Sequence, residues 1–131
     1  MRVPVTAASL FFALICGCST TTENIMDVDT VIMRSAELSG QRILVEGYLK
    51  YEFEDHNLYA AQRYALEWSR DHCISIGLSR NAEPDLESAS GQWVIITGIL
   101  SNEFCPPNSI CTFSCSQRIG VFVENVQVRS Q

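Results

Sequence analysis

Two stretches of ten residues, GQRILVEGYL at positions 40–49 and GQWVIITGIL at positions 91–100, repeat one pattern without gaps. Four of the ten aligned positions are identical, and three more exchange one branched apolar residue for another. The pattern of each copy indicates a turn, a strand, a glycine and a further strand. Because such strands bury one apolar face, the repeat predicts a mainly β domain with two similar strands at its core.

The first copy belongs to a longer alternating segment, residues 42–54. One face is predicted to be buried and the other is charged, and the apolar set is Ile43, Val45, Leu49, Tyr51 and Phe53. Gly47 falls at an inward position midway, where a glycine lets a long strand bend sharply. The second copy is apolar on both faces, which predicts that it is covered more deeply.

Shorter patterns complete the expected order of elements. Strands are predicted over residues 57–61, 73–78 and 119–128, with a turn over residues 55–57 before the first of them. A short helix is predicted over residues 62–72. One or two helical turns are predicted over residues 84–90, where Pro84 is tolerated at the start.

This order resembles the OB-fold, a five-stranded Greek-key barrel, with the two repeat copies as its first and fourth strands. The stretch from about Val28 to Arg129 is similar to small exported OB-like bacterial proteins of unknown function, many of them assigned as lipoproteins. The resemblance implies a small five-stranded barrel with one or two short helices, and it implies almost nothing about activity. A β-sandwich is the alternative fold, and it would need more strands than the sequence offers.

The first eighteen residues, MRVPVTAASLFFALICGC, have the order of a bacterial lipoprotein signal. Arg2 is followed by an apolar stretch shorter than the roughly 18–20 residues of a membrane-spanning helix. Gly17 precedes Cys18, the expected lipidation site. We therefore expect a signal peptide over residues 1–17, a lipidated cysteine and polar tether over residues 18–27, and one domain over residues 28–131.

The signal predicts a lipid-anchored protein of the bacterial cell envelope. Ser19, rather than an aspartate, follows the lipidated position, which favours the outer membrane, facing the periplasm, in a Gram-negative cell. Cys16 is unusual at its place in the signal, so ordinary cleavage to a secreted or periplasmic protein is the alternative. A permanently retained N-terminal anchor is the least favoured reading.

Four cysteines remain after the signal: Cys73, Cys105, Cys111 and Cys115. An even number in an exported chain predicts two disulfides, for which three connectivities exist. In an OB barrel the third and fifth strands are parallel and adjacent, which implies a Cys73–Cys115 bridge and leaves Cys105 for Cys111. Their spacing is not a usual zinc pattern, and no C-x-x-C redox motif is present. We expect no metal and no cofactor.

The charge balance of the chain limits the classes of partner that it can bind. The formal net charge is −6, the chain has a single lysine, Lys50, and its arginines are scattered. A phosphate backbone attracts clustered cations, and OB domains that bind nucleic acid present a basic, aromatic face. We therefore expect no nucleic-acid partner. The expected partners are the membrane, through the N-terminal lipid, and an envelope protein or a cell-wall glycan.

Candidate sites are few. A charged cluster could bind a divalent cation, although a solvated strand edge is the more ordinary interpretation; it comprises Glu52, Glu54, Asp55 and His56. A hydrolase triad could be sought in Asp71 and His72 with Ser69, Ser75 or Ser79, but no G-x-S-x-G motif exists. Among the aromatic residues, Tyr48 and Tyr59 are the best candidates for a ligand-binding surface.

The sequence thus favours a non-catalytic binding or interaction module anchored in the cell envelope. Two alternatives stay open. The first is a purely structural or stress-related envelope protein without a small ligand, and the second, more remote, is a hydrolase.

The lipid anchor is directly testable. We expect the mature chain to begin at a lipidated Cys18, so Cys18→Ala should release the protein from the membrane or stall its processing. Intact-mass analysis of the mature protein measures this. An unmodified N-terminus at another position would contradict the anchor.

Overall fold

The computed structural model describes residues 24–80, 82, 84–106, 108–111 and 115–129. The expected signal peptide, the expected lipidation site Cys18 and most of the expected tether lie outside these residues.

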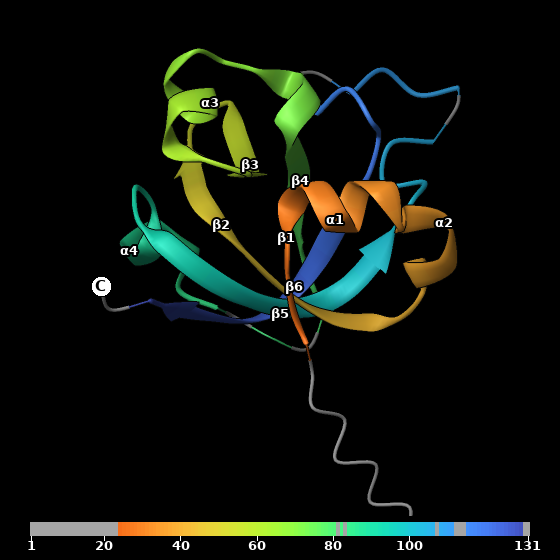
Figure 1. Ribbon diagram of the computed structural model, residues 1–131, viewed down its shortest axis with the longest axis horizontal. Helices are drawn as coiled ribbons and strands as arrows, with labels where there is room; N and C mark the ends of the chain where they lie inside the picture. Colours follow the sequence, from red (N-terminus) through yellow and green to blue (C-terminus); the bar gives the residue numbers. More distant parts are fainter. Residues whose placement is uncertain (1–23, 81, 83, 107, 112–114, 130–131) are drawn as a thin grey trace, which may run out of the picture.

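Within the described residues, one sheet of six strands is accompanied by a few short helices (Figure 1). The predicted mainly β fold is therefore confirmed. The strands are β1 (Ile25–Asp27), β2 (Arg42–Glu52), β3 (Asp55–Tyr59), β4 (Cys73–Leu78), β5 (Trp93–Ser101) and β6 (Gly120–Val128). The helices are α1 (Val28–Met33), α2 (Ser35–Leu38), α3 (Gln62–Leu66) and α4 (Leu86–Ala89), with a 3-10 turn at Arg70–His72.

The two copies of the repeat are β2 and β5, and they pair with each other. Their antiparallel register sets Gly47 opposite Val94 and Gly98 opposite Ile43, so each copy places its glycine against the first branched apolar residue of the other. A Cβ atom on Gly47 would lie 2.7 Å from the Tyr59 carbonyl oxygen, and one on Gly98 would lie 2.3 Å from the Phe122 carbonyl oxygen. Glycine is needed at both positions because the backbone of a further strand lies close to each of them. The backbone of β3 approaches Gly47 of β2, and the backbone of β6 approaches Gly98 of β5.

The remaining pairings give the sheet order β1-β2-β3-β4-β6-β5, with the additional contact of β2 to β5. β4 and β6 are parallel neighbours, as the OB-fold resemblance implied for the third and fifth expected strands. The predicted five-stranded barrel is not what the structure has: the six strands form one sheet that is not a closed barrel. β1 is the strand that the prediction lacked, and it lies parallel to β2 at the sheet edge.

Several predicted boundaries are wrong. β2 ends at Glu52 because the chain turns at Phe53 and Glu54, where Glu54 adopts a positive φ of 66°, and β3 already begins at Asp55. Phe53 is consequently 91% exposed instead of buried. The helix predicted over residues 62–72 ends at Leu66, and the chain then bends at Trp68, which has a φ of 54°.

The segment before the repeat folds into elements that the sequence did not predict. The Asp27 carboxylate accepts a hydrogen bond of 2.7 Å from the Thr30 backbone N–H and so caps α1. α1 then buries Val28 and Val31 against the sheet, and α2 adds Leu38. α4, which the sequence placed over residues 84–90, is shorter and buries Leu86 and Ala89.

The core has two parts. The main cluster fills the inner face of the sheet and includes Val45, Leu49, Val94 and Ile96, all fully buried. A smaller cluster lies against α3 and consists of Tyr59, Ala65, Cys73 and Cys115, with Tyr48 and Tyr64 packed at its margin. The outer side chains of β5 are half-buried, so the deeper covering expected for the second repeat copy is only partly present.

The disulfides have the pairing implied by the expected strand order. Cys73 is joined to Cys115 with a Cα–Cα distance of 5.6 Å, and Cys105 is joined to Cys111 with a Cα–Cα distance of 6.0 Å. The first bridge connects the start of β4 to the segment before β6. The Cys115 backbone N–H also donates to the Ser75 hydroxyl at 3.2 Å. The long-range bridge therefore fixes the parallel pair β4 and β6.

The two bridges should differ in their effect on stability. They span 42 and 6 residues of sequence, so the loop-closure model assigns them about 4 and about 2 kcal/mol. We expect the double variant Cys73→Ala/Cys115→Ala to lower the free energy of unfolding more than the matched control Cys105→Ala/Cys111→Ala, as measured by urea denaturation. A larger loss in the control would contradict this assignment.

Candidate functional site

The outer face of β2 carries a row of polar side chains. Because side chains at alternate positions share one face of a strand, Glu46, Tyr48 and Lys50 all project away from the main core, whereas Val45 and Leu49 point into it. Glu46 forms an ion pair with Arg129, and Lys50 lies 3.7 Å from the Asp55 carboxylate. Tyr48, between them, borders a cleft.

The cleft is open to solvent and has a volume of about 420 Å³. Four parts of the chain contribute to it: β2, the start of α3, the start of β5 and the end of β6. Its lining comprises Tyr48, Ala61, Gln62, Gly91, Gln92, Trp93, Val128 and Arg129. The cleft thus combines two aromatic rings, two side-chain amides and one guanidinium group.

Local contacts hold the cleft open. Gly91 has a φ of 80°, which favours glycine, and a Cβ atom there would lie 3.8 Å from the Tyr48 hydroxyl oxygen. The Arg129 backbone N–H donates to the Trp93 carbonyl oxygen at 2.9 Å, which ties the end of the chain to β5. The Gln92 amide donates to the Ser88 carbonyl oxygen at 3.0 Å. Gln62, by contrast, is an exposed side chain at the first position of α3.

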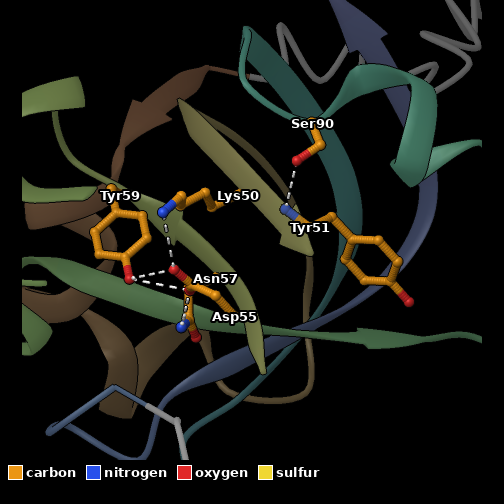
Figure 2. Close-up of polar contacts among 6 residues, drawn as sticks. All are labelled: Lys50, Tyr51, Asp55, Asn57, Tyr59 and Ser90. Atoms are coloured by element: carbon orange, nitrogen blue, oxygen red, sulfur yellow. Dashed lines mark hydrogen bonds and ion pairs between the residues drawn. The ribbon is translucent and has the colours of Figure 1, made fainter. Parts of the chain in front are cut away.

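Tyr59, the second tyrosine proposed for ligand binding, is fully buried, so that part of the prediction is wrong. It pairs with Tyr48 across β2 and β3, but α3 and Cys115 cover its ring. Its hydroxyl donates to the Asp55 carboxylate, with O···O distances of 3.0 and 3.2 Å (Figure 2). Burial, and then the negative charge of Asp55, raise the pKa of Tyr59 to about 12.

Asp55 itself is the centre of a buried polar network. Its carboxylate also accepts a hydrogen bond of 2.7 Å from the Asn57 amide and lies beside the Lys50 ammonium group (Figure 2). A buried carboxylate is stable only when such partners compensate for its lost hydration. Asp55 therefore has a structural role at the start of β3.

The charged cluster suggested as a cation site is not assembled. Asp55 points into the molecule, while His56 stacks on Tyr51 with ring centroids 4.2 Å apart. Among the residues that the structure describes, no group of three or more histidine, cysteine or acidic side chains is arranged to hold a metal ion.

The suggested hydrolase residues have other partners. His72 Nδ1 lies 3.2 Å from an Asp29 carboxylate oxygen, and the imidazole stacks on Tyr64. Ser75 is buried, and its hydroxyl faces Cys115. His72 thus contacts Asp29 from α1 instead of its sequence neighbour Asp71.

Nothing in the sequence indicated Gln62 or Arg129 as site residues, and Trp68 and Trp93 ranked behind Tyr48 and Tyr59 among the aromatic residues that could line a groove. The indole of Trp68 is 56% exposed, and the Lys50 ammonium and Arg70 guanidinium groups lie 5.8 and 5.6 Å from the centre of its ring. One sequence feature could have indicated part of this site, because the alternation of β2 places Tyr48 and Lys50 on the same face of the strand. The position of Trp68 was not readable, because it depends on the left-handed bend that ends α3.

No protein-family model matches the chain, and a search of curated proteins finds no match. In the part of the chain that the structure describes, no helix is both long and apolar enough to cross a membrane.

The Tyr59–Asp55 contact predicts a specific pH dependence. An ordinary tyrosine has a pKa near 10, so the raised pKa stabilises the folded protein fully below about pH 10, and this stability is lost as the pH rises towards 12. We expect Tyr59→Phe to lower the free energy of unfolding by about 1–3 kcal/mol at neutral pH, because it removes a hydrogen bond to a buried carboxylate. It should also reduce the loss of stability between about pH 10 and pH 12.

Urea denaturation at several pH values measures both effects. Tyr64→Phe is the matched control, because the Tyr64 hydroxyl accepts its hydrogen bond from Arg63 at the surface, and we expect a change within about 0.5 kcal/mol. Equal effects of the two variants would refute the role assigned to Tyr59.

Proposed function

We propose that this chain is a lipid-anchored binding module of the bacterial cell envelope, and that its cleft holds a glycan. The domain is assigned to the OB-like class on the order of its strands. The series β2-β3-β4-β6-β5, with β4 parallel to β6 and β2 paired to β5, supports this assignment. The edge strand β1 is an addition to that arrangement.

The observation that carries the proposed ligand is the composition of the cleft. Tyr48 and Trp93 offer aromatic surface on which the apolar faces of sugar rings can stack, and the Gln62 amide can exchange hydrogen bonds with sugar hydroxyls. The volume of about 420 Å³ falls within the usual range for small-molecule sites. This lining suits a ligand that is apolar on its ring faces and polar at its edges.

Other partners fit the cleft less well. Nucleic acid would require several cations, but Arg129 is the only cationic side chain in the lining and it is paired with Glu46. A stable protein partner generally needs a larger buried area with an apolar centre.

The proposed anchor limits where the ligand can be. Residues 19–24 separate Cys18 from the start of β1 and reach at most about 20 Å when extended. A tether of this length would keep the domain close to the membrane surface, within reach of glycan in the adjacent envelope layer.

Binding to purified peptidoglycan tests the proposal. We expect the full mature chain, extracted in detergent, to sediment with insoluble peptidoglycan. Gln62→Trp, which places a bulky side chain in the cleft from an exposed position, should weaken the apparent affinity at least about tenfold, the loss expected when about 1.4 kcal/mol of contact is blocked.

Gln117→Trp is the matched control, because it introduces the same side chain at an exposed turn outside the cleft lining. No sedimentation of the unaltered chain, or equal binding by both variants, would refute the glycan site. In-cell crosslinking that captures one envelope protein and no glycan would identify a protein-interaction module instead.

A further inference from the structure

The last part of β6 has one open edge. β4 pairs with β6 only from Gly120 to Val123, and the Ser79 backbone N–H donates to the Val123 carbonyl oxygen at 3.2 Å where the two strands part. On the other side, β5 continues beside β6 as far as Val128. Among the residues that the structure describes, no strand pairs with residues 124–128 on the side that β4 has left.

The backbone groups of Val126 and Val128 face this open edge. The Arg129 backbone N–H donates to the Trp93 carbonyl oxygen on β5. Because successive residues of an antiparallel pair direct their N–H and C=O groups to opposite sides, those of Gln127 also face β5, and those of Val126 and Val128 face away from it. An edge of this kind offers hydrogen-bond donors and acceptors in a row.

A second pocket, with a volume of about 420 Å³ and open to solvent, lies against this part of β6. Asn125 lines it from one face of the strand, and Val126 and Val128 line it from the other. The pocket therefore borders the edge of β6 rather than a single face. Its opposite wall is α4 with the residues that precede it.

The pocket adjoins the cleft. Val128 lines both cavities and is 45% exposed. The Gln92 amide at the cleft donates to the carbonyl oxygen of Ser88, which lines the pocket. A chain-like ligand can therefore pass from the cleft into the pocket across Val128.

An open strand edge beside an apolar wall suits an acetamido group. This group has one N–H donor and one C=O acceptor, the same pair that the peptide unit of a neighbouring strand would offer to the edge. Its methyl group can contact Pro84 and Ala89, which also line the pocket. Of the described residues in this lining, only Asp85 is charged, and its carboxylate caps α4. The pocket thus favours a neutral group with the polarity of an amide.

We propose that the ligand is a chain of N-acetylated hexosamines that occupies the cleft and the adjoining pocket, with an acetamido group bound to the open edge of β6. The inference rests on the proposed function and names the class of sugar. Tyr48 and Trp93 stack on sugar rings in the cleft, and the backbone groups of Val126 and Val128 bind the acetamido group of a unit further along the chain. A sugar with a hydroxyl group in that place would leave the apolar wall without contact.

Two pairs of neutral oligosaccharides test the inference. Chitotetraose and chitobiose carry acetamido groups, and cellotetraose and cellobiose have the same backbone linkage with hydroxyl groups in their place. Titration calorimetry with the full mature chain in detergent measures the affinities. We expect chitotetraose to bind about tenfold more tightly than cellotetraose, because a site that bonds an amide discriminates against a ligand that lacks it. It should also bind more tightly than chitobiose, because the longer chain can fill both cavities.

Two variants locate the acetamido site. Val128→Pro removes an N–H that faces the open edge and no bond to β5, and it should reduce the preference for chitotetraose over cellotetraose several-fold. The matched control Val128→Ala shortens the same side chain and keeps the N–H. Asn125→Trp fills the pocket from an exposed position and does not depend on a proline in the strand. It should lower the affinity for chitotetraose to that for chitobiose, whereas Gln117→Trp should not.

The outcomes separate this inference from the proposed function. Equal affinities for chitotetraose and cellotetraose refute the acetamido site, and the cleft stands if Gln62→Trp weakens the binding of both. An equal loss of preference in Val128→Ala and Val128→Pro would assign the effect to the side chain and refute the bond to the strand edge. If Asn125→Trp behaves as Gln117→Trp does, the ligand does not enter the pocket. If no sugar binds the unaltered chain, the acetamido site and the glycan cleft are refuted together.

Discussion

The pairing of β2 with β5 is the constraint on which the rest of the structure depends. The two strands carry the same sequence pattern and lie antiparallel, with Val45 opposite Ile96 at the centre and a glycine near each end of the shared segment. Each glycine leaves room for the backbone of a further strand. β3 can therefore approach β2, and β6 can approach β5, at positions that a side chain would block. The pairing therefore has an approximate two-fold symmetry, and it forces both strands to take part in more than one pairing. The cleft opens where this central pair ends, at Tyr48 and Trp93.

The sequence predicted what depends on regular alternation, and it failed where long-range packing decides. The alternation of apolar and polar residues along residues 42–52 identified β2. The repeat identified β5 as a second strand with the same pattern. The disulfide pairing followed from the implied strand order. β1 and α2 have only three and four residues, too few to show a period. Phe53 continues the alternation of β2, but the positive φ of Glu54 ends the strand and leaves the phenyl ring in solvent.

The two tyrosines proposed for ligand binding show how far alternation can specify a site. Tyr48 and Tyr59 are cross-strand neighbours on one face, so the sequence pattern makes them equivalent. Their environments differ because α3 and Cys115 arrive from distant parts of the chain and cover Tyr59 completely but Tyr48 only in part. The covered tyrosine stabilises a buried carboxylate, and the other remains at the cleft. Neighbouring positions thus acquired a structural and a surface role through contacts that only the folded chain provides.

Lys50 joins these two roles, because its ammonium group lies between the buried Asp55 network and the exposed ring of Trp68. It is also the single lysine of the chain. An acyl chain on the α-amino group of a lipidated N-terminus would leave Lys50 as the one primary amine in the mature protein. Amine-directed reagents would then modify the molecule at one position only, on the outer face of β2, and a fluorophore or crosslinker attached there would report on that face without any engineered residue.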